Sequence, residues 1–195
     1  MNAIEMNRVS AILLAGGKSS RMGRDKATLH FQGLSLLEWQ IQKLRGLGIE
    51  DIMLSGSRQE MEGIRVVPDE FPERGPLGGL HACMKVARNS DCLVLSVDVP
   101  RVPPQALTEL IRAHLKRGAA VTLLRHGDKW EPLIGVYQSG LYRVAESILQ
   151  GENTAVRRLL AETGFQLVDW SEDETLFLNC NTPEDYARLQ LLDES

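Results

Sequence analysis

The chain has 195 residues, a length that fits one domain with a sizeable hydrophobic core. Hydrophobic residues make up 43% of the sequence and charged residues 25%, and the formal net charge is −4. This mildly acidic balance disfavours nucleic acids and anionic membranes as partners, because both select a basic face. No apolar run reaches the ~18 residues of a membrane span, and the first residues do not resemble a secretion signal.

Three cysteines occur without paired or metal-like spacing, and two of them stand in apolar surroundings. Buried thiols in a reducing compartment explain this pattern better than a disulfide framework does. We therefore expect a cytoplasmic protein in which three thiols are free: Cys83, Cys92 and Cys180.

Short apolar runs alternate with helical patterns along the first two-thirds of the chain. The expected strands are 9–14, 52–54, 65–67, 92–97 and 120–124. The expected helices are 36–47, 80–87 and 103–117. This alternation predicts an α/β fold with three Rossmann-like layers, in which a mostly parallel sheet carries helices on both faces.

The last third of the chain is less regular. We expect a strand at 130–137, which could run antiparallel, helices at 140–149 and 154–163, and short strands at 167–170 and 177–178. Pro183 starts a last helix, for which Thr182 is the expected N-cap. No Pro/Gly/Ser-rich linker separates these elements from the earlier ones, so we expect a single domain.

The most informative segment follows the first strand. Its apolar residues end at the pair Gly16 and Gly17, and Arg21 and Lys26 come shortly afterwards. Backbone N–H groups can approach an anion closely where side chains are absent, and cations complete such a site. The segment therefore predicts a phosphate-binding loop rather than an ordinary turn with solvated cations.

This loop matches neither of two common phosphate-binding patterns. The Walker pattern requires Gly-Lys-Ser/Thr five residues after its first Gly, and here Gly23 is followed by Arg24. The dinucleotide pattern Gly-x-Gly-x-x-Gly fails because Gly16 and Gly17 are adjacent. A different class of nucleotide-binding protein is indicated.

Asp98 directly follows the apolar strand 92–97 and precedes Val99-Pro100. A carboxylate at the end of a buried strand suits Mg²⁺, which takes one or two protein carboxylates together with phosphate and water oxygens. A turn aspartate before proline explains the spacing equally well.

The element Leu-Ala-Gly-Gly-x-Ser-x-Arg-Met-Gly-x-Asp-Lys over residues 14–26 resembles the opening loop of nucleotidyltransferases that act on the molybdenum cofactor. The best resemblance is to the molybdenum cofactor guanylyltransferase family. It covers most of the chain and includes Asp69, Gly75-Pro-Leu-Gly-Gly79, Asp98 and Asn179-Cys-Asn-Thr-Pro. It implies a fold of the nucleotide-diphospho-sugar transferase type. Residues 1–195 would form one domain, with a nucleotide-binding part at about 9–125 and an acceptor-binding part at about 126–195.

The resemblance also implies roles for particular residues. Lys26, Arg21 and Asp98 would be catalytic, and Asp98 would hold the metal. The implied nucleotide-binding residues are Leu14, Ala15, Gly16, Gly17, Lys26, Ser55, Asp69 and Asp98. The implied acceptor-binding residues are Arg21, Gly75, Gly79, Arg157, Asn179 and Asn181.

Three of these positions keep an alternative explanation. Ser55 stands where the family often has asparagine, and a hydroxyl offers fewer hydrogen-bonding groups than an amide. A Pro/Gly turn before a helix explains Gly75-Pro-Leu-Gly-Gly79. A solvated helix arginine explains Arg157 as well as phosphate binding does.

The implied activity is transfer of GMP from GTP to the terminal phosphate of molybdopterin or the molybdenum cofactor, with Mg²⁺ and with release of pyrophosphate. The sequence Leu-Ala-Gly-Gly favours the guanylyl branch, because related cytidylyltransferases tend to have Leu-Ala-Ala-Gly. The alternatives are a cytidylyltransferase, a sugar-phosphate nucleotidyltransferase or a nucleotide-binding adaptor without catalysis. Proteins of cofactor biosynthesis or molybdoenzymes are candidate partners, and the sequence leaves the oligomeric state open.

Overall fold

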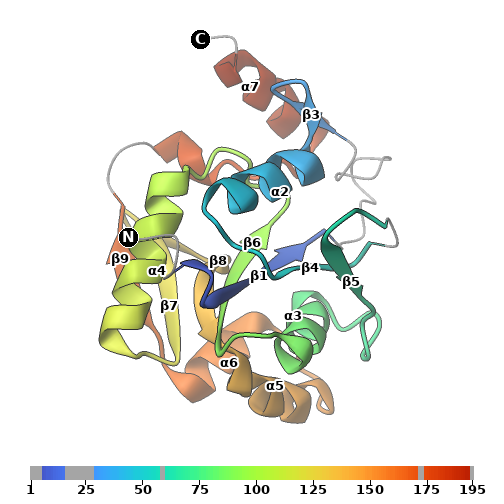
Figure 1. The fold of residues 1–195 in the computed structure, drawn as a ribbon, viewed down its shortest axis with the longest axis vertical. Coiled ribbons are helices and arrows are strands. Elements are labelled where there is room, and N and C mark those ends of the chain that lie inside the picture. Colours follow the sequence, from blue (N-terminus) through green and yellow to red (C-terminus); the bar gives the residue numbers. More distant parts are fainter. Residues whose placement is uncertain (1–5, 16–28, 58–59, 171–173, 194–195) are drawn as a thin grey trace.

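A seven-stranded sheet forms the centre of the computed structural model, which describes residues 6–15, 29–57, 60–170 and 174–193 (Figure 1). Its strands are β1 (Val9–Leu14), β4 (Ile52–Ser55), β5 (Ile64–Val67), β6 (Asp91–Ser96), β7 (Val121–His126), β8 (Lys129–Gln138) and β9 (Gln166–Asp169). Their order across the sheet is β5-β4-β1-β6-β8-β7-β9. Strand β8 runs antiparallel to β6 and β7, and the other neighbouring pairs are parallel. The expected mostly parallel α/β fold is confirmed.

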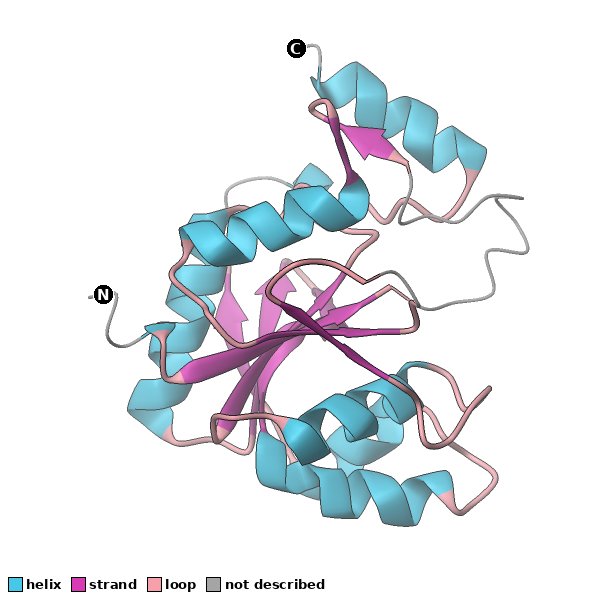
Figure 2. Ribbon diagram, turned by 45° about the vertical axis from the view of Figure 1, so that its right-hand side comes forward, coloured by secondary structure: helices cyan, strands magenta, loops and turns pink. Residues whose placement is uncertain are grey.

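Helices cover both faces of this sheet (Figures 1 and 2). One face carries α2 (Leu36–Gly46) and α4 (Pro104–Arg117), and the other carries α3 (Pro76–Val86), α5 (Tyr142–Leu149) and α6 (Val156–Thr163). Side chains of a strand alternate between the two faces. Accordingly Ala11 and Leu13 of β1 pack into the first layer, while Ile12 and Leu14 pack into the second. A strand that is buried on both faces explains the uninterrupted apolar run in the sequence.

The helix termini have identifiable causes in the sequence. Ser35 caps α2: its hydroxyl accepts a hydrogen bond from the Glu38 N–H at 3.2 Å, and its own N–H donates to the Glu38 carboxylate at 2.9 Å. Helix α4 ends at Gly118, which has a φ of 62°. Helix α3 begins at Pro76 rather than at residue 80 as expected, because the proline occupies the favoured first helical position.

The structure differs from the sequence-based expectations at three further places. Residues 177–178 were expected to form a strand, which is wrong: a 3₁₀ turn, η4 (Glu174–Phe177), lies there. The segment 140–149 begins with a 3₁₀ turn, η3 (Ser139–Leu141), before α5. A short hairpin, β2 (His30–Phe31) and β3 (Leu34–Ser35), was not expected.

The last helix, α7 (Pro183–Asp193), begins as predicted. The Asp185 N–H donates to the Thr182 hydroxyl at 3.1 Å, and the Thr182 N–H donates to the Asp185 carboxylate at 2.9 Å. Helix α7 and the β2–β3 hairpin lie together at one end of the molecule (Figure 1). The Tyr186 hydroxyl joins them by donating to the His30 carbonyl at 3.0 Å.

The three cysteines are buried free thiols, as expected. Burial raises the pKa of Cys83 to about 12. In the described parts of the chain, no helix is both long enough and apolar enough to cross a membrane.

Candidate active site at the carboxyl edge of the sheet

Strand β1 leads directly into the predicted phosphate loop, whose residues Gly16, Gly17, Arg21 and Lys26 lie outside the described residues. The residues on either side of that segment are held by backbone hydrogen bonds. The Ala15 N–H donates to the Ser55 carbonyl at 3.0 Å, and the Leu29 carbonyl accepts from the Leu36 N–H at 2.7 Å. The chain therefore enters the loop at the carboxyl ends of β1 and β4.

Gly79 of α3 packs against the carboxyl ends of β1 and β4. A side chain at Gly79 would collide with the Ser55 hydroxyl, and its Cβ would lie 3.1 Å from Ser55 Cβ and 3.4 Å from a methyl group of Leu14. The absent side chain thus allows the α3 backbone to contact both strand ends. The sequence assigned Gly79 to the acceptor side, yet the structure places it against Leu14 and Ser55 of the expected nucleotide set.

Asp69 follows β5 and lies over the first turn of α3. Its carboxylate accepts a hydrogen bond from the Phe71 N–H at 2.8 Å. A Cβ atom at Gly78 would lie only 2.7 and 2.8 Å from the two Asp69 oxygens and 2.9 Å from the Phe71 carbonyl oxygen. Gly78 therefore makes room for Asp69, and sequence analysis gave Gly78 no role. In the sequence, the only sign of this close packing is that Gly78 stands next to Gly79.

Gly75 is the N-cap of α3 and has a φ of 71°, in the region that favours glycine. It is exposed, and a Cβ atom there would meet nothing within 4 Å. Its backbone conformation therefore explains the glycine, whereas close packing explains Gly78 and Gly79.

Asp98 lies two residues beyond the end of β6, on the strand next to β1. The Ser96 hydroxyl donates to its carboxylate at 2.5 Å. The Asp98 carbonyl accepts a hydrogen bond from the Cys180 N–H at 2.8 Å. Because Asn179 and Asn181 flank Cys180, the structure brings the backbone of both predicted asparagines close to that of the candidate metal ligand.

Glu131 is a further carboxylate beside Asp98. Strand β8 pairs antiparallel with β6 as far as Leu95 opposite Ile134, so Asp98 and Glu131 both lie three residues beyond the same end of this pairing. Burial and, after it, the charge of Asp98 raise the pKa of Glu131, while the cations of Arg157 and Lys129 oppose this shift. The sequence alone could not identify this neighbour, because the pairing register decides it.

Arg157 lies on α6 at the same end of the molecule. Its guanidinium carbon lies 4.3 Å from the centre of the Trp130 ring, a cation–π contact that limits where this exposed side chain can point. Trp130 in turn packs against Phe165, with ring centres 5.0 Å apart. Arg157 is therefore a cation held over Trp130, and its charge acts on the nearby Glu131.

Helix α2 contacts the loop that follows β6. We call this loop, residues 97–101, the Asp98 loop. The Gln40 amide donates to the carbonyls of Ser96 at 3.2 Å and Val99 at 3.1 Å. The Pro100 carbonyl accepts from Lys43 Nζ at 2.8 Å and from Trp39 Nε1 at 3.0 Å. Burial lowers the pKa of Lys43 to about 7. The sequence indicates only a helix at 36–47, and its pattern does not reveal these contacts.

The donor set at Asp98 fits a hard divalent cation. Asp98 and Glu131 offer carboxylate oxygens, and a bound cation would relieve the repulsion by which, after burial, Asp98 raises the pKa of Glu131. Within the described ranges, no group of three or more His, Cys, Asp or Glu side chains could hold a metal. Substrate phosphate and water would thus have to complete the ligand sphere, which is the usual arrangement for Mg²⁺.

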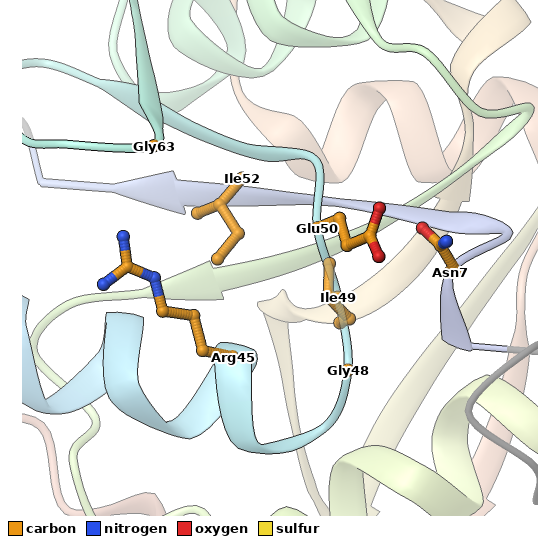
Figure 3. A pocket seen from close by; sticks show the side chains of 7 residues that line it. All are labelled: Asn7, Arg45, Gly48, Ile49, Glu50, Ile52 and Gly63. Atoms are coloured by element: carbon orange, nitrogen blue, oxygen red, sulfur yellow. The ribbon is translucent and has the colours of Figure 1, made fainter.

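A separate hollow of about 620 Å³ lies near the start of β4 (Figure 3). It is lined by Asn7, Arg45, Gly48, Ile49, Glu50, Ile52 and Gly63. This is the amino edge of β4, opposite the edge where Ser55 ends the strand. Ligands of open parallel sheets bind beyond the carboxyl ends of the strands, so the site residues and this hollow are distinct.

Comparison with known proteins decides the family. The family model described as "MobA-like NTP transferase domain" matches residues 11–168. The chain belongs to this family of nucleotidyltransferases. A relative in Ectopseudomonas mendocina, named molybdenum cofactor guanylyltransferase, is 34% identical over 188 residues, which cover 93% of this chain and 92% of that protein.

Several solved structures have the same fold as this chain. Molybdopterin-guanine dinucleotide biosynthesis protein A from Archaeoglobus fulgidus matches with a TM-score of 0.77 at 22% identity, covering 95% of this chain and 100% of that one. The 2-C-methyl-D-erythritol 4-phosphate cytidylyltransferase from Thermus thermophilus matches with a TM-score of 0.70 at 15% identity, covering 96% and 100%. The fold expected from the sequence, that of nucleotide-diphospho-sugar transferases, is confirmed.

Proposed function

We propose that this nucleotidyltransferase transfers GMP from GTP to the terminal phosphate of molybdopterin or the molybdenum cofactor. One observation carries the proposal: backbone hydrogen bonds join the Asp98 loop both to the expected nucleotide-binding residues and to the expected acceptor-binding segment. The Val97 N–H donates to the Leu14 carbonyl at 3.1 Å, and the Asp98 carbonyl accepts from the Cys180 N–H at 2.8 Å. A carboxylate between a nucleotide site and an amide-bearing site suits a reaction between two phosphates. Relatives named molybdenum cofactor guanylyltransferase support the choice of substrates.

The chemistry requires positioning and neutralisation of charge more than covalent participation of the protein. An oxygen of the acceptor's terminal phosphate attacks the α-phosphorus of GTP, and the bond from this phosphorus to the bridging β-phosphate oxygen breaks. Pyrophosphate leaves with that oxygen, and the product joins pterin and GMP through a diphosphate. From the sequence motif we assign nucleotide phosphates to the backbone at Gly16 and Gly17, charge neutralisation to Lys26, and the incoming phosphate to Arg21.

Asp98 is the residue proposed to hold Mg²⁺. The bound ion would screen the repulsion between the two anionic reactants. Glu131 adds negative charge next to Asp98 and thereby strengthens the attraction for a cation. Asp69, Ser55 and Leu14 would line the nucleoside part of the site.

On the acceptor side, the Asn179 and Asn181 amides offer donors and acceptors that a pterin edge can use. Arg157, held over Trp130, would bind the acceptor's phosphate. We also propose a cytoplasmic location, which fits the three free thiols, and hand-over of the product to proteins that use or complete the cofactor.

The test measures pyrophosphate release by the purified protein with molybdopterin, Mg²⁺ and one nucleotide at a time. We expect kcat/KM for GTP to exceed that for CTP and ATP by roughly a hundredfold, as is typical when a site hydrogen-bonds its base. Asp98→Ala should lose nearly all activity, because it removes the proposed metal ligand while it leaves the backbone bonds of the loop in place.

Each alternative gives a different result in this assay. A preference for CTP would replace the guanylyl assignment with the cytidylyl one. Release of pyrophosphate with a sugar phosphate instead of molybdopterin would indicate the sugar-phosphate branch. A protein that binds GTP but releases no pyrophosphate with any acceptor would be an adaptor.

A further inference from the structure

We propose that Gln40 and Lys43 of α2 are positioning residues that fix the Asp98 loop for cation binding. The inference deepens the proposed function and rests on it for the role of Asp98. Neither side chain touches the Asp98 carboxylate in the described contacts. Gln40 binds the backbone on both sides of Asp98, and Lys43 binds the backbone two residues after it, so they would act through the loop.

The sheet supports the start of the loop, where the Val97 N–H donates to the Leu14 carbonyl at 3.1 Å. Strand β6 ends at Ser96, so ladder hydrogen bonds do not fix Asp98. Instead the carbonyls around it accept hydrogen bonds from other parts of the chain. Gln40 binds those of Ser96 and Val99, and Lys43 binds that of Pro100. These bonds from α2 and the Cys180 bond to the Asp98 carbonyl hold the loop from two sides.

The two polar side chains are costly at their positions in the core. Gln40 is fully buried, and its amide oxygen has no hydrogen-bond partner within the described part of the chain. Lys43 is only 8% exposed. Burying an unsatisfied polar group destabilises the fold, and burying a charge does so more strongly. Neighbouring positions of α2 hold apolar residues such as Leu37, Ile41 and Leu44.

An apolar residue at either position would bury the same surface without this cost. Core stability alone therefore does not explain Gln40 and Lys43, whereas a requirement for a fixed loop does. Mg²⁺ tolerates little deviation from octahedral geometry, and a misplacement of about 1 Å at a reacting centre can cost ~100-fold in rate. A loop held by five carbonyl contacts keeps the carboxylate in one place.

The test compares Gln40→Met and Lys43→Met with Gln42→Met, a control on the same helix whose side chain is exposed. Binding of Mn²⁺ in the presence of GTP, without any acceptor, is measured by water-proton relaxation. We expect each of the first two variants to weaken Mn²⁺ binding about tenfold and Gln42→Met to leave it unchanged. Amide hydrogen exchange at residues 97–101 of the metal-free protein should accelerate in the same two variants.

Kinetics and a double variant separate positioning from general destabilisation. We expect kcat to fall while KM for molybdopterin stays within about twofold, because the acceptor residues are untouched. In an Asp98→Ala background, Lys43→Met should weaken Mn²⁺ binding no further, since it acts through Asp98.

Unchanged Mn²⁺ binding and unchanged exchange in both variants would overturn the inference, as would an additional loss in the double variant. A protein that binds Mn²⁺ and GTP with the expected differences between variants, yet transfers no GMP, would retain the inference and lose the proposed function.

Discussion

Asp51 and Asp98 occupy opposite edges of the same sheet and differ in their surroundings. Asp51 precedes β4 and is 5% exposed. Its carboxylate accepts hydrogen bonds from the Ser10 hydroxyl at 2.6 Å, the Arg88 N–H at 3.0 Å and the Arg65 guanidinium at 2.7 Å. Burial alone would raise the pKa of Asp51, but these hydrogen bonds together outweigh it and lower the pKa. Asp51 is therefore a structural carboxylate.

This shift predicts a pH-dependent contribution to stability. Because the folded-state pKa lies below the ordinary value of 3.8, ionised Asp51 stabilises the protein above that pH and loses its effect as the pH falls through the folded-state pKa. Asp51→Asn should lower the free energy of unfolding by about 2 kcal/mol at pH 7. The difference from the parent should shrink below about pH 4.

Urea unfolding at several pH values measures this difference, with Asp128→Asn in an exposed turn as the control for loss of a surface carboxylate. A difference for Asp51→Asn that stays constant from pH 7 to pH 3 would contradict the account.

Residues with a strong local signature were predictable from the sequence. Asp98 follows a buried strand, and Asn179 and Asn181 precede a helix start, so sequence placed them at element ends that the structure brings together. Glu131 and Gln40 lack such a signature. Their roles depend on the β6–β8 register and on which face of α2 meets the loop, and both are settled only by packing.

At the scale of elements, the first turn of α3 packs against the ends of strands that border the proposed nucleotide site. Gly78 allows Asp69 to lie against it, and Gly79 allows contact with Ser55 and Leu14. Helix α3 thus packs closely against residues at the ends of β5, β4 and β1.

Gly78→Ala tests this arrangement. The added methyl group would collide with the Asp69 carboxylate and the Phe71 carbonyl, so we expect a loss of about 1–3 kcal/mol in stability and a higher KM for GTP. Gly46→Ala, at the end of α2, is the matched control because nothing lies within 4 Å of its added methyl group. Equal stability and equal KM values for GTP in the two variants would show that α3 does not set the position of Asp69.

Elements with a clear period or cap were predicted well, and short ones were not. The strand 9–14 and the helix at 36–47 carry long apolar patterns and match β1 and α2 closely. Phe177 and Leu178 form too short a pattern to distinguish a strand from a 3₁₀ turn that packs on the core. The β2–β3 hairpin has only two residues in each strand, which no periodicity can reveal.

At the scale of the molecule, both halves of the sequence build one sheet. Strands β8 and β9 come from the later part of the chain, yet β8 inserts between β6 and β7 of the earlier part. This insertion places β8, which carries Glu131, beside β6, which leads to Asp98 (Figure 1). The hydrogen bond between Cys180 and Asp98 then joins the C-terminal segment to the same edge. Two substrates would therefore meet at one edge, across Asp98.

The central claim is that the protein transfers a nucleotidyl group between these two substrates, and labelled GTP tests it most directly. The protein is incubated with molybdopterin and GTP that carries ³²P at either the α or the γ position. We expect the α label to enter the pterin product and the γ label to appear in pyrophosphate. Transfer of the γ label to the pterin, or accumulation of GDP and phosphate instead, would contradict it.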